Sequence, residues 1–439
     1  MKKLSIITFG LFSFIQLKSQ TNEFLPLSRN GIGFINRSWS PQAQGCGHAG
    51  LAYSSEEEFN PMNPASLGFL KITDAEFGYS YKTKKISDGK IEITDNSGTL
   101  SYIQLGVPLR NSINEILERK EYKHNYAMSL GLSPLSSTSY SYIIIDSTST
   151  GREARLLNGS GGLNQFQLGF AYRVNHLSLG INLGYVFGNL SYEQTFYLID
   201  QSPINRDIFS DRYFGSGFKP EVGVIYEQLL KDKAESKNKQ RKLGYSLLVS
   251  PGGNLRFLKN SFYRSELDLS EFGSIIDTLV YVNESKSKAQ LPFKISAGIS
   301  YNHRDKSGIM LDAGIENWAS AKKFDGQRGD LVNQQYVGLG AWIRPDNSGY
   351  GNVFKRSQYR MGVFYDNGYL EINDEKLKNY GLTLGMGTSF NFQRQICVVN
   401  LSFEVGKTEI AKAISEKYFK VTAGIRINDN EWFLKRRYN

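Results

Sequence analysis

Cys46 and His48 lie two residues apart in "GCGHAG" and are the closest pair of cysteine or histidine side chains in the sequence. A zinc site of the common tetrahedral type needs about four such ligands, usually arranged as two pairs. The other cysteine, Cys397, and the three remaining histidines stand far from this pair along the chain. The sequence therefore predicts no metal site and no cofactor, and its two cysteines allow at most one disulfide.

The sequence gives even less indication of a catalytic site. A nucleophilic serine of the hydrolase type stands in a G-x-S-x-G turn, with a histidine and an acid brought near it by the fold. The chain contains no such turn. The glycine run "GSGG" at 159–162 precedes a strand pattern, where a hairpin bend is expected rather than a phosphate-binding loop. We predict no catalytic residue and no enzymatic activity.

The stretch "EEEFNPMNPASL", from Glu56 to Leu67, combines charge with unusual backbone chemistry. Asn-Pro steps favour turns, because the asparagine side chain bonds nearby backbone while proline fixes one backbone angle and removes an N–H donor. The adjacent acids Glu56, Glu57 and Glu58 fit two interpretations, an electrostatic gate in a lumen or a solvated face. A rigid segment with few free donors suits the inside of a barrel, where irregular backbone is tolerated.

The elements that must hold this segment are strands with one apolar face. In "LNQFQLGFAYRVNHLSLGINLGYVFGNL" (163–190), large apolar residues alternate with Gln, Gly, Ser and Asn, and in the second arm only Val186 breaks the rule. Each arm of this hairpin has about 10 residues, the length of a tilted strand that crosses a membrane. Strands of soluble sandwiches are shorter, and a soluble protein could not expose such a surface.

The same rhythm recurs along most of the chain. We place strands at 76–86, 97–108, 124–134, 163–174, 177–190, 217–229, 242–252, 291–303, 307–318, 332–344, 357–367, 379–392, 394–406 and 417–428. About 14 strands is an even number, as in bacterial single-chain barrels, and lipid requires the strand edges to close into a ring. Connections at 135–162, 191–216 and 253–290 are predicted as long outer loops, and tight turns are predicted at 175–176, 304–306 and Gln393.

The composition fits a membrane barrel and excludes other classes. Mean hydropathy is −0.37, and no interior stretch approaches the ~18 apolar residues of a spanning helix. The 26 tyrosines, 27 phenylalanines and 43 glycines suit a twisted sheet with aromatic girdles. The net charge is +10, but its basic residues gather in "KDKAESKNKQRK" and at the C-terminal end. We interpret these as solvated turns and predict no nucleic-acid partner.

Residues 1–19 have the features of a secretory signal peptide. Lys2 and Lys3 precede the apolar run "LSIITFGLFSFIQL", and a small residue, Ser19, precedes Gln20. Export followed by insertion of the strands predicts the outer membrane of a Gram-negative bacterium as the location. Outer-membrane lipid would then surround the apolar faces.

The segment before the first strand resembles the N-terminal hatch of the FadL family of outer-membrane transporters for long-chain fatty acids and other hydrophobic compounds. The resemblance covers about 40 residues, and its matching positions are Gly47, Ala49, Ala52 and Tyr53, followed by Asn63, Pro64 and Ala65. It implies a 14-stranded barrel whose luminal hatch moves to open a path for an apolar ligand such as a fatty acid. Gly47, Ala49, Asn63, Pro64 and Ala65 are then the candidate gating residues.

The chain also looks like a Bacteroidetes branch of that family, through "SYIQLGVPL", "LGLSPLSSTSY" and the tail "WFLKRRYN". Members of this branch include plug and shuttle subunits of the type IX secretion translocon. Two functions stay open: a passive channel for hydrophobic small molecules, or a non-transporting barrel that serves as plug or accessory subunit of such a translocon. The predicted divisions are a signal peptide (1–19), a hatch (20–75), the barrel (76–428) and a basic periplasmic tail (429–439).

Overall fold

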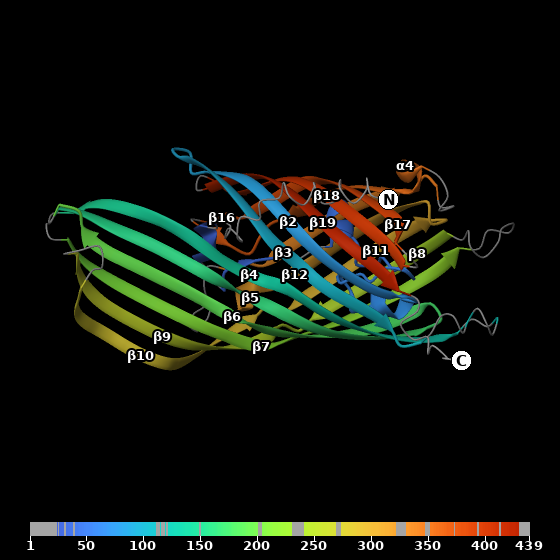
Figure 1. The fold of residues 1–439 in the computed structure, drawn as a ribbon, viewed down its shortest axis with the longest axis horizontal. Helices are drawn as coiled ribbons and strands as arrows, with labels where there is room; N and C mark the ends of the chain where they lie inside the picture. The colour runs from blue at the N-terminus through green and yellow to red at the C-terminus, as the bar shows by residue number, and fades with distance from the viewer. Residues whose placement is uncertain are drawn as a thin grey trace.

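The alternating segments pair edge to edge into one closed antiparallel sheet in the computed structural model of the chain (Figure 1). The structure describes residues 24–429 except 25, 30–31, 38–39, 111–114, 116–118, 120–121, 149–150, 201–203, 231–240, 269–273, 322–330, 347–351, 373, 393–394 and 412–413. The predicted signal peptide, and the predicted basic tail after Asp429, lie outside the described residues.

The wall has fourteen strand positions, which confirms the predicted all-β barrel. In chain order its strands are β2 (Thr73–Ser87), β3 (Glu92–Pro108), β4 (His124–Thr148), β5 (Gly151–Val174), β6 (Leu177–Leu198), β7 (Ile204–Leu230), β8 (Arg241–Ser250), β9 (Gly253–Asp268), β10 (Ser274–Leu291), β11 (Lys294–His303), β12 (Ser307–Glu316), β13 (Gln334–Ile343), β14 (Gln358–Asp366), β17 (Lys378–Phe392), β18 (Gln395–Ile410) and β19 (Ile414–Asp429). Strand β19 pairs with β2 over its whole length, which closes the ring.

Two of these positions are shared by two strands each. Strand β7 pairs with β8 near one end and with β9 towards the other. The next position is divided in the same way, since β8 pairs with β11 and β9 with β10. Pro251 and Pro292 stand at the two breaks. Proline has no N–H to give to a ladder, so it interrupts a strand at such places.

Short elements lie before and between the wall strands. They are η1 (Pro26–Arg29), β1 (Phe34–Ile35), α2 (Pro41–Gly45), η2 (Pro64–Phe69), η4 (Trp318–Ser320), α4 (Val353–Arg356), β15 (Glu371–Ile372) and β16 (Glu375–Lys376). We use the name hatch for residues 40–70, which include α2 and η2. No helix among the described residues has the length and apolar character needed to cross a membrane.

The outer side of the ring is apolar, as the alternation predicts. On β5, Phe166, Leu168 and Phe170 are 42–47% exposed, and on β6 Leu179 and Ile181 are 48–57% exposed. The residues between them along each strand point into the lumen, and most are buried or partly buried. Such a band of side chains would be an aggregation site in water and is stable against lipid.

On one side of the barrel, at the left of Figure 1, the sheet continues far beyond the other strands through β4, β5, β6, β7, β9 and β10. The ladder between β4 and β5 runs on to Thr148 and Gly151, and the ladder between β9 and β10 reaches Leu267 and Ser274. We call this part the outer wall. It consists of residues 139–148 of β4, 151–161 of β5, 190–198 of β6, 204–217 of β7, and strands β9 and β10.

The outer wall corrects part of the loop prediction. Segments 135–162, 191–216 and 253–290, predicted as long outer loops, are mostly strand. They lack a clean alternation because the outer wall extends past the apolar band, where its outward face need not be apolar. Cross-strand pairing and a packed inner face hold it instead. The tight turns predicted at 175–176 and 304–306 are confirmed, while Gln393 lies outside the described residues.

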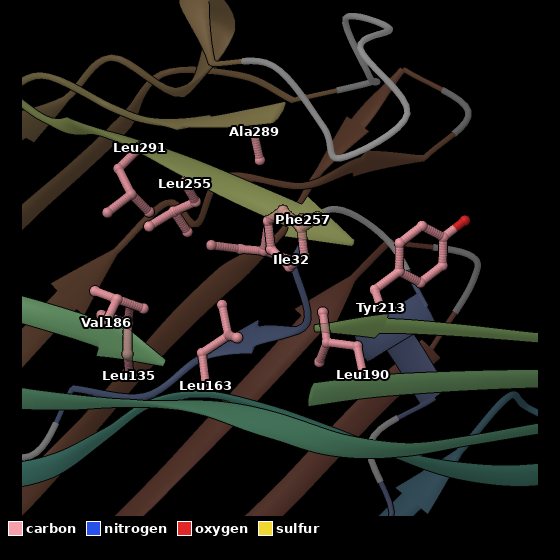
Figure 2. Packing of buried hydrophobic residues seen from close by; sticks show 10 residues of the cluster. All are labelled: Ile32, Leu135, Leu163, Val186, Leu190, Tyr213, Leu255, Phe257, Ala289 and Leu291. Atoms are coloured by element: carbon pink, nitrogen blue, oxygen red, sulfur yellow. The ribbon is translucent and has the colours of Figure 1, made fainter. Parts of the chain in front are cut away.

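A packed apolar cluster, the apolar floor, lies on the inner face at the base of the outer wall. Its members are Ile32, Leu135, Leu163, Val186, Leu190, Tyr213, Leu255, Phe257, Ala289 and Leu291. Figure 2 shows that these side chains converge from several outer-wall strands on Ile32 of the N-terminal segment. Val186, the exception to the alternation of β6, is fully buried here because the lumen is apolar at this level.

Candidate functional site

The hatch is shaped by two capped turns of helix. Ser40 caps α2 by accepting a hydrogen bond from the Ala43 N–H, and Pro41 starts that helix. Asn63 caps η2 by accepting from the Ala65 N–H at 3.0 Å, and proline again takes the first position. Proline is favoured there because the first N–H of a helix has no partner within it. The Asn-Pro step predicted as a turn is thus the start of a short 3-10 helix.

The predicted residues Asn63, Pro64 and Ala65 are seated against β6 and β7. The Asn63 amide donates to the carbonyl oxygens of Leu51 within the hatch, at 3.3 Å, and of Val224 on β7, at 3.4 Å. The Ser178 hydroxyl on β6 donates to the Ala65 carbonyl at 2.6 Å. All three predicted residues are buried. They fix one side of the hatch to the wall.

Gly47 and Ala49 lie against a different arc of the wall. Gly47 has a φ of 64°, and a Cβ there would stand 2.5 Å from the Leu339 oxygen and from the Val363 nitrogen. Its N–H donates to the Thr383 hydroxyl on β17 at 2.9 Å. Only glycine fits this backbone conformation and this close approach. The five predicted residues therefore do not form one cluster, and each group is a separate contact of hatch with wall.

Two acidic wall residues outside the predicted hatch motif make short hydrogen bonds with the hatch. The Asp312 carboxyl group on β12 accepts from the N–H groups of Gly50, at 2.6 Å, and Leu51, at 2.7 Å. On β2, the Asp74 carboxyl group accepts from the Phe59 N–H at 2.7 Å. Both carboxyl groups are buried and held by hatch backbone.

Ion pairs complete this circle of contacts. Arg426 on β19 pairs with Glu58 of the hatch at 2.7 Å, and both side chains are buried. Glu404 on β18 accepts from the Gln44 amide at 2.7 Å and contacts His48 Nε2 at 3.2 Å. Of the three acids Glu56–Glu58, only Glu58 points into the barrel; the other two are exposed. The solvated interpretation is therefore confirmed for two of them.

The cavities beside the hatch are small and have mixed polar and apolar linings. One has a volume of about 190 Å³, and one between the hatch and the base of the outer wall has about 170 Å³. Charged residues line the first, including Arg37, His48, Lys82, Asp366, Glu404 and Lys420. Sites for apolar ligands are larger and mainly apolar. Among the described residues, no group of three or more His, Cys, Asp or Glu side chains could hold a metal ion.

In the described part of the wall, the ladder is short between β3 and β4, and we call this place the split. These strands pair only from Ile103 and Leu132 to Pro108 and Ala127. Towards the outer side of this ladder, β3 pairs only with β2, and β4 continues to pair with β5. A register shift in the pairing of β3 with β2 falls at the same height. A cavity of about 30 Å³ at the split is lined both by hatch prolines and by lipid-facing side chains. It is large enough for water and far too small for a ligand.

Comparison with solved structures finds outer-membrane channels of the FadL type, at identities that show the fold alone. A Pseudomonas aeruginosa FadL homologue matches with a TM-score of 0.56 and 11% identity, over 91% of this chain and 99% of that one. The CymD monoaromatic hydrocarbon channel matches with a TM-score of 0.52 and 15% identity, over 90% of this chain and 98% of that one. The Pseudomonas putida toluene transporter TodX matches with a TM-score of 0.51 and 12% identity, over 90% of this chain and 99% of that one.

The protein is thus an outer-membrane β-barrel with the fold of the FadL and TodX channels, as found in Gram-negative bacteria. A search of curated proteins gives no match. The family assignment differs from the sequence-based expectation, because the model that matches is that of BamG, and it covers residues 1–439. The predicted FadL resemblance is confirmed as a likeness of fold, and the chain belongs to the BamG family.

Proposed function

We propose that the protein is a closed, non-transporting outer-membrane barrel that serves as a subunit bound to another protein. The observation that carries this proposal is the attachment of the hatch around the lumen. Its hydrogen bonds and ion pairs reach strands β2, β6, β7, β11, β12, β17, β18 and β19. A gate that opens for each ligand would have to break many of these contacts together.

The chemistry of the lumen supports the same proposal. A fatty acid or toluene gains its binding energy from apolar surface removed from water. The inward faces around the hatch instead present acidic and basic side chains that the hatch already binds, Asp74 and Asp312 through its backbone and Glu404 and Arg426 through its side chains. In this proposal the candidate residues fix the hatch to the wall rather than open it as a gate; they are Gly47, Ala49, Asn63, Pro64 and Ala65. The type IX translocon stays one candidate partner, suggested by the sequence resemblance.

Passage of a hydrophobic compound is the second candidate function, favoured by the split between β3 and β4. Lipid-facing Ile103, Leu130 and Leu132 meet Pro61 and Pro64 of the hatch at this point. A widened split would join the lumen to the hydrocarbon layer. The structural neighbours CymD and TodX are named as channels for monoaromatic hydrocarbons and toluene. In this structure the split is closed.

A disulfide that locks the hatch separates the two functions. Ala52 of the hatch and Gly244 of β8 are the pair chosen, since a Cβ on Gly244 would lie 3.7 Å from the Ala52 Cβ, which matches disulfide geometry. The same Cβ would lie 2.9 Å from the Ala52 carbonyl oxygen, so this stretch of hatch backbone has to shift slightly to form the bond. Ser300→Ala removes the hydroxyl that would collide with the new Cβ, and with it the hydrogen bond that Ser300 donates to the Ala52 carbonyl. The locked variant is Ala52→Cys with Gly244→Cys in this background, and Ser300→Ala alone is its matched control.

The measurement is uptake of radiolabelled oleate and of toluene into vesicles that contain the purified full chain. We expect wild-type vesicles to take up both compounds at the rate of empty vesicles, with the locked variant unchanged. Uptake well above that of empty vesicles, abolished by the disulfide and restored by a reducing agent, would establish the channel and overturn the subunit proposal.

A further inference from the structure

The outer wall ends in two edge strands, β4 and β10. Beyond Ser139, the described ladder of β4 is with β5 alone, and that of β10 is with β9. On the far side of β10, the barrel ladder of β11 with β12 begins only at Lys294 and Glu316. The outer wall is therefore a curved sheet with two free sides, and we call the space between β10 and β4 the seam.

Apolar runs lie on both edges at the same height. One hydrogen-bonding row across the outer wall consists of Ile143, Leu156, Thr195, Ile208, Arg264 and Thr278. At one end of this row lies the segment "YIII" of β4, in which Ile143 is 55% exposed and Ile145 is 59% exposed. At the other end lies the segment "LVYV" of β10, in which Leu279 is 51% exposed and Tyr281 is 72% exposed. Edge strands of stable sheets usually carry charges or are covered. Two uncovered apolar edges at one height point to a partner that fits between them.

An aromatic cup opens on the inner face of the outer wall, beyond the apolar floor. Its volume is about 510 Å³ and its aromatic lining is Tyr140, Tyr192, Phe196, Phe209, Tyr213 and Tyr263. Burial raises the pKa values of Tyr140 and Tyr192, so both phenols stay neutral donors. Tyrosine offers a rigid surface that is apolar on its face and polar at its tip, which suits protein recognition.

The cup also contains a fixed charged acceptor. The Asp211 carboxylate accepts from the Ser261 hydroxyl at 2.6 Å and the Tyr263 hydroxyl at 3.1 Å, and it pairs with Lys259 at 3.0 Å. Cross-strand pairs connect Asp211 on β7, through β9, to Val282 on β10. They also connect Tyr263 on β9 to Val280 on β10. Paired residues share one face of a sheet, so Val280 and Val282 border the cup. The cup and the edge of β10 are thus one continuous surface.

The chain itself shows what kind of segment the seam accepts. At the base of the outer wall, strand β1 pairs with Ser136 and Ser137 on the edge of β4, and its Ile35 packs against the apolar floor, to which β10 contributes Ala289 and Leu291. An extended segment two residues long therefore occupies the lower end of the seam. The described structure places nothing of this kind beside residues 279–282 or 142–145.

We propose that the seam takes an extended segment of a partner protein, which adds a short strand to the edge of β10 or β4 and places apolar side chains in the cup. This is strand addition, in which backbone bonds supply affinity and adjacent pockets supply specificity. At this height, register shifts before residue 280 and after residue 282 limit the regular pairing of β10 to residues 280–282, so the added strand is about three or four residues long. The inference rests on the proposed function, because a closed barrel acts through its surfaces.

A small apolar molecule is a poorer occupant, since it would fill the cup and leave both edges uncovered. A second copy of the chain is compatible with strand direction, because β4 runs outward and β10 inward. However, two barrels in one membrane would have to approach closely enough for the tall edges to meet. The partner segment alone covers edges and cup together.

Photo-crosslinking in cells tests this on the full-length chain. Benzoylphenylalanine replaces Tyr281 on β10 or Ile143 on β4, and a third variant carries it at Arg212, which is exposed in the middle of the outer wall. We expect both edge positions to crosslink one and the same segment of one protein, identified by peptide mapping, and Arg212 to give less than a tenth of that yield.

A second substitution links the crosslink to the edge. Val280→Lys, combined with the crosslinker at Ile143, should lower the yield at least tenfold, because the lysine places a charge between edge and cup. Val280→Thr keeps the branched shape and should change the yield less than twofold. Resistance of the unboiled barrel to detergent shows that both variants fold.

Several results would overturn the seam proposal. These are adducts with lipid only, adducts with a second copy of the chain, equal yields from Arg212, or a yield that Val280→Lys leaves unchanged. None of them bears on the oleate and toluene uptake of the vesicles. Failure of the seam proposal and failure of the closed-barrel proposal are therefore distinguishable.

Discussion

Replacement of Asn63 by alanine should loosen the hatch by an amount that the structure lets us calculate. The Asn63 side chain is buried and caps η2 through the Ala65 N–H. Loss of such a cap costs about 1 kcal/mol. Its amide also satisfies the buried carbonyl of Leu51, and an unsatisfied buried acceptor adds on the order of 1–2 kcal/mol. The free energy of hatch opening should fall by about 2–3 kcal/mol, which corresponds to a roughly 30- to 150-fold larger open population.

The two cysteines of the chain provide the assay. Cys46 lies in the hatch and is 1% exposed, whereas Cys397 lies in β18 and is 6% exposed. A maleimide reagent should label Cys46 of the Asn63→Ala variant about 30- to 150-fold faster than in the wild type, with labelling of Cys397 unchanged. Asn164→Ala, at an exposed asparagine of β5, is the matched control.

A change of less than twofold at Cys46 would refute the reasoning about the hatch. A parallel rise at both cysteines would refute it differently, because it would show that the whole barrel loosens. The first outcome would mean that the eight-strand attachment does not depend on this cap. The second would mean that hatch and wall open as one unit.

Two further substitutions test other parts of the molecule. A Cβ on Gly340 of β13 would overlap the carbonyl oxygen of Cys46, so Gly340→Val should displace the hatch and raise the rate of Cys46 labelling at least tenfold. Gly131→Val is the control, because a Cβ there meets only ordinary contacts, and it should leave the rate of Cys46 labelling unchanged. Leu255→Ala in the apolar floor should destabilise the outer wall by about 2–5 kcal/mol, detected as faster proteolysis of strands β9 and β10. Leu168→Ala on the lipid-facing side, where the side chain is half exposed, should leave that rate within about twofold.

All fourteen strand positions could be predicted because lipid imposes a strict rule on them. An outward side chain at membrane depth must be apolar, so every second residue of a strand such as β12 carries the signal. The outer wall could not be predicted in this way. Beyond the apolar band water accepts polar residues on its outward face, and the segment "STSYSYIIIDSTST" gives no period that separates strand from loop. Long cross-strand ladders decide its structure, and single-sequence patterns do not contain them.

The hatch residues were predictable in position and less so in role. Asn63 and Pro64 stand out by turn chemistry and Gly47 only through the resemblance to the FadL hatch, and the structure places each in contact with the wall. The residues that hold the hatch most firmly, such as Asp312 and Arg426, were missed. Their signal was nevertheless in the sequence, since each occupies the inward phase of an alternating strand, in "IMLDAGIE" and "VTAGIRIN". A charge in that phase needs water or a partner.

These inward charges bear directly on what the barrel does. A passage for an apolar compound needs a continuous apolar stripe along the lumen, because each unpaired polar group beside it would lose its hydration. Strands β12, β18 and β19 carry Asp312, Glu404 and Arg426 in the inward phase, at the level of the hatch. Each of them is bonded by a hatch group, so removal of the hatch would take away the N–H donors of Asp312, the Glu58 partner of Arg426 and the Gln44 donor of Glu404. An apolar ligand could not replace those bonds, whereas water could. If this barrel opens at all, what passes beside these strands should therefore be polar, and the test is ionic conductance of a variant that lacks residues 40–70.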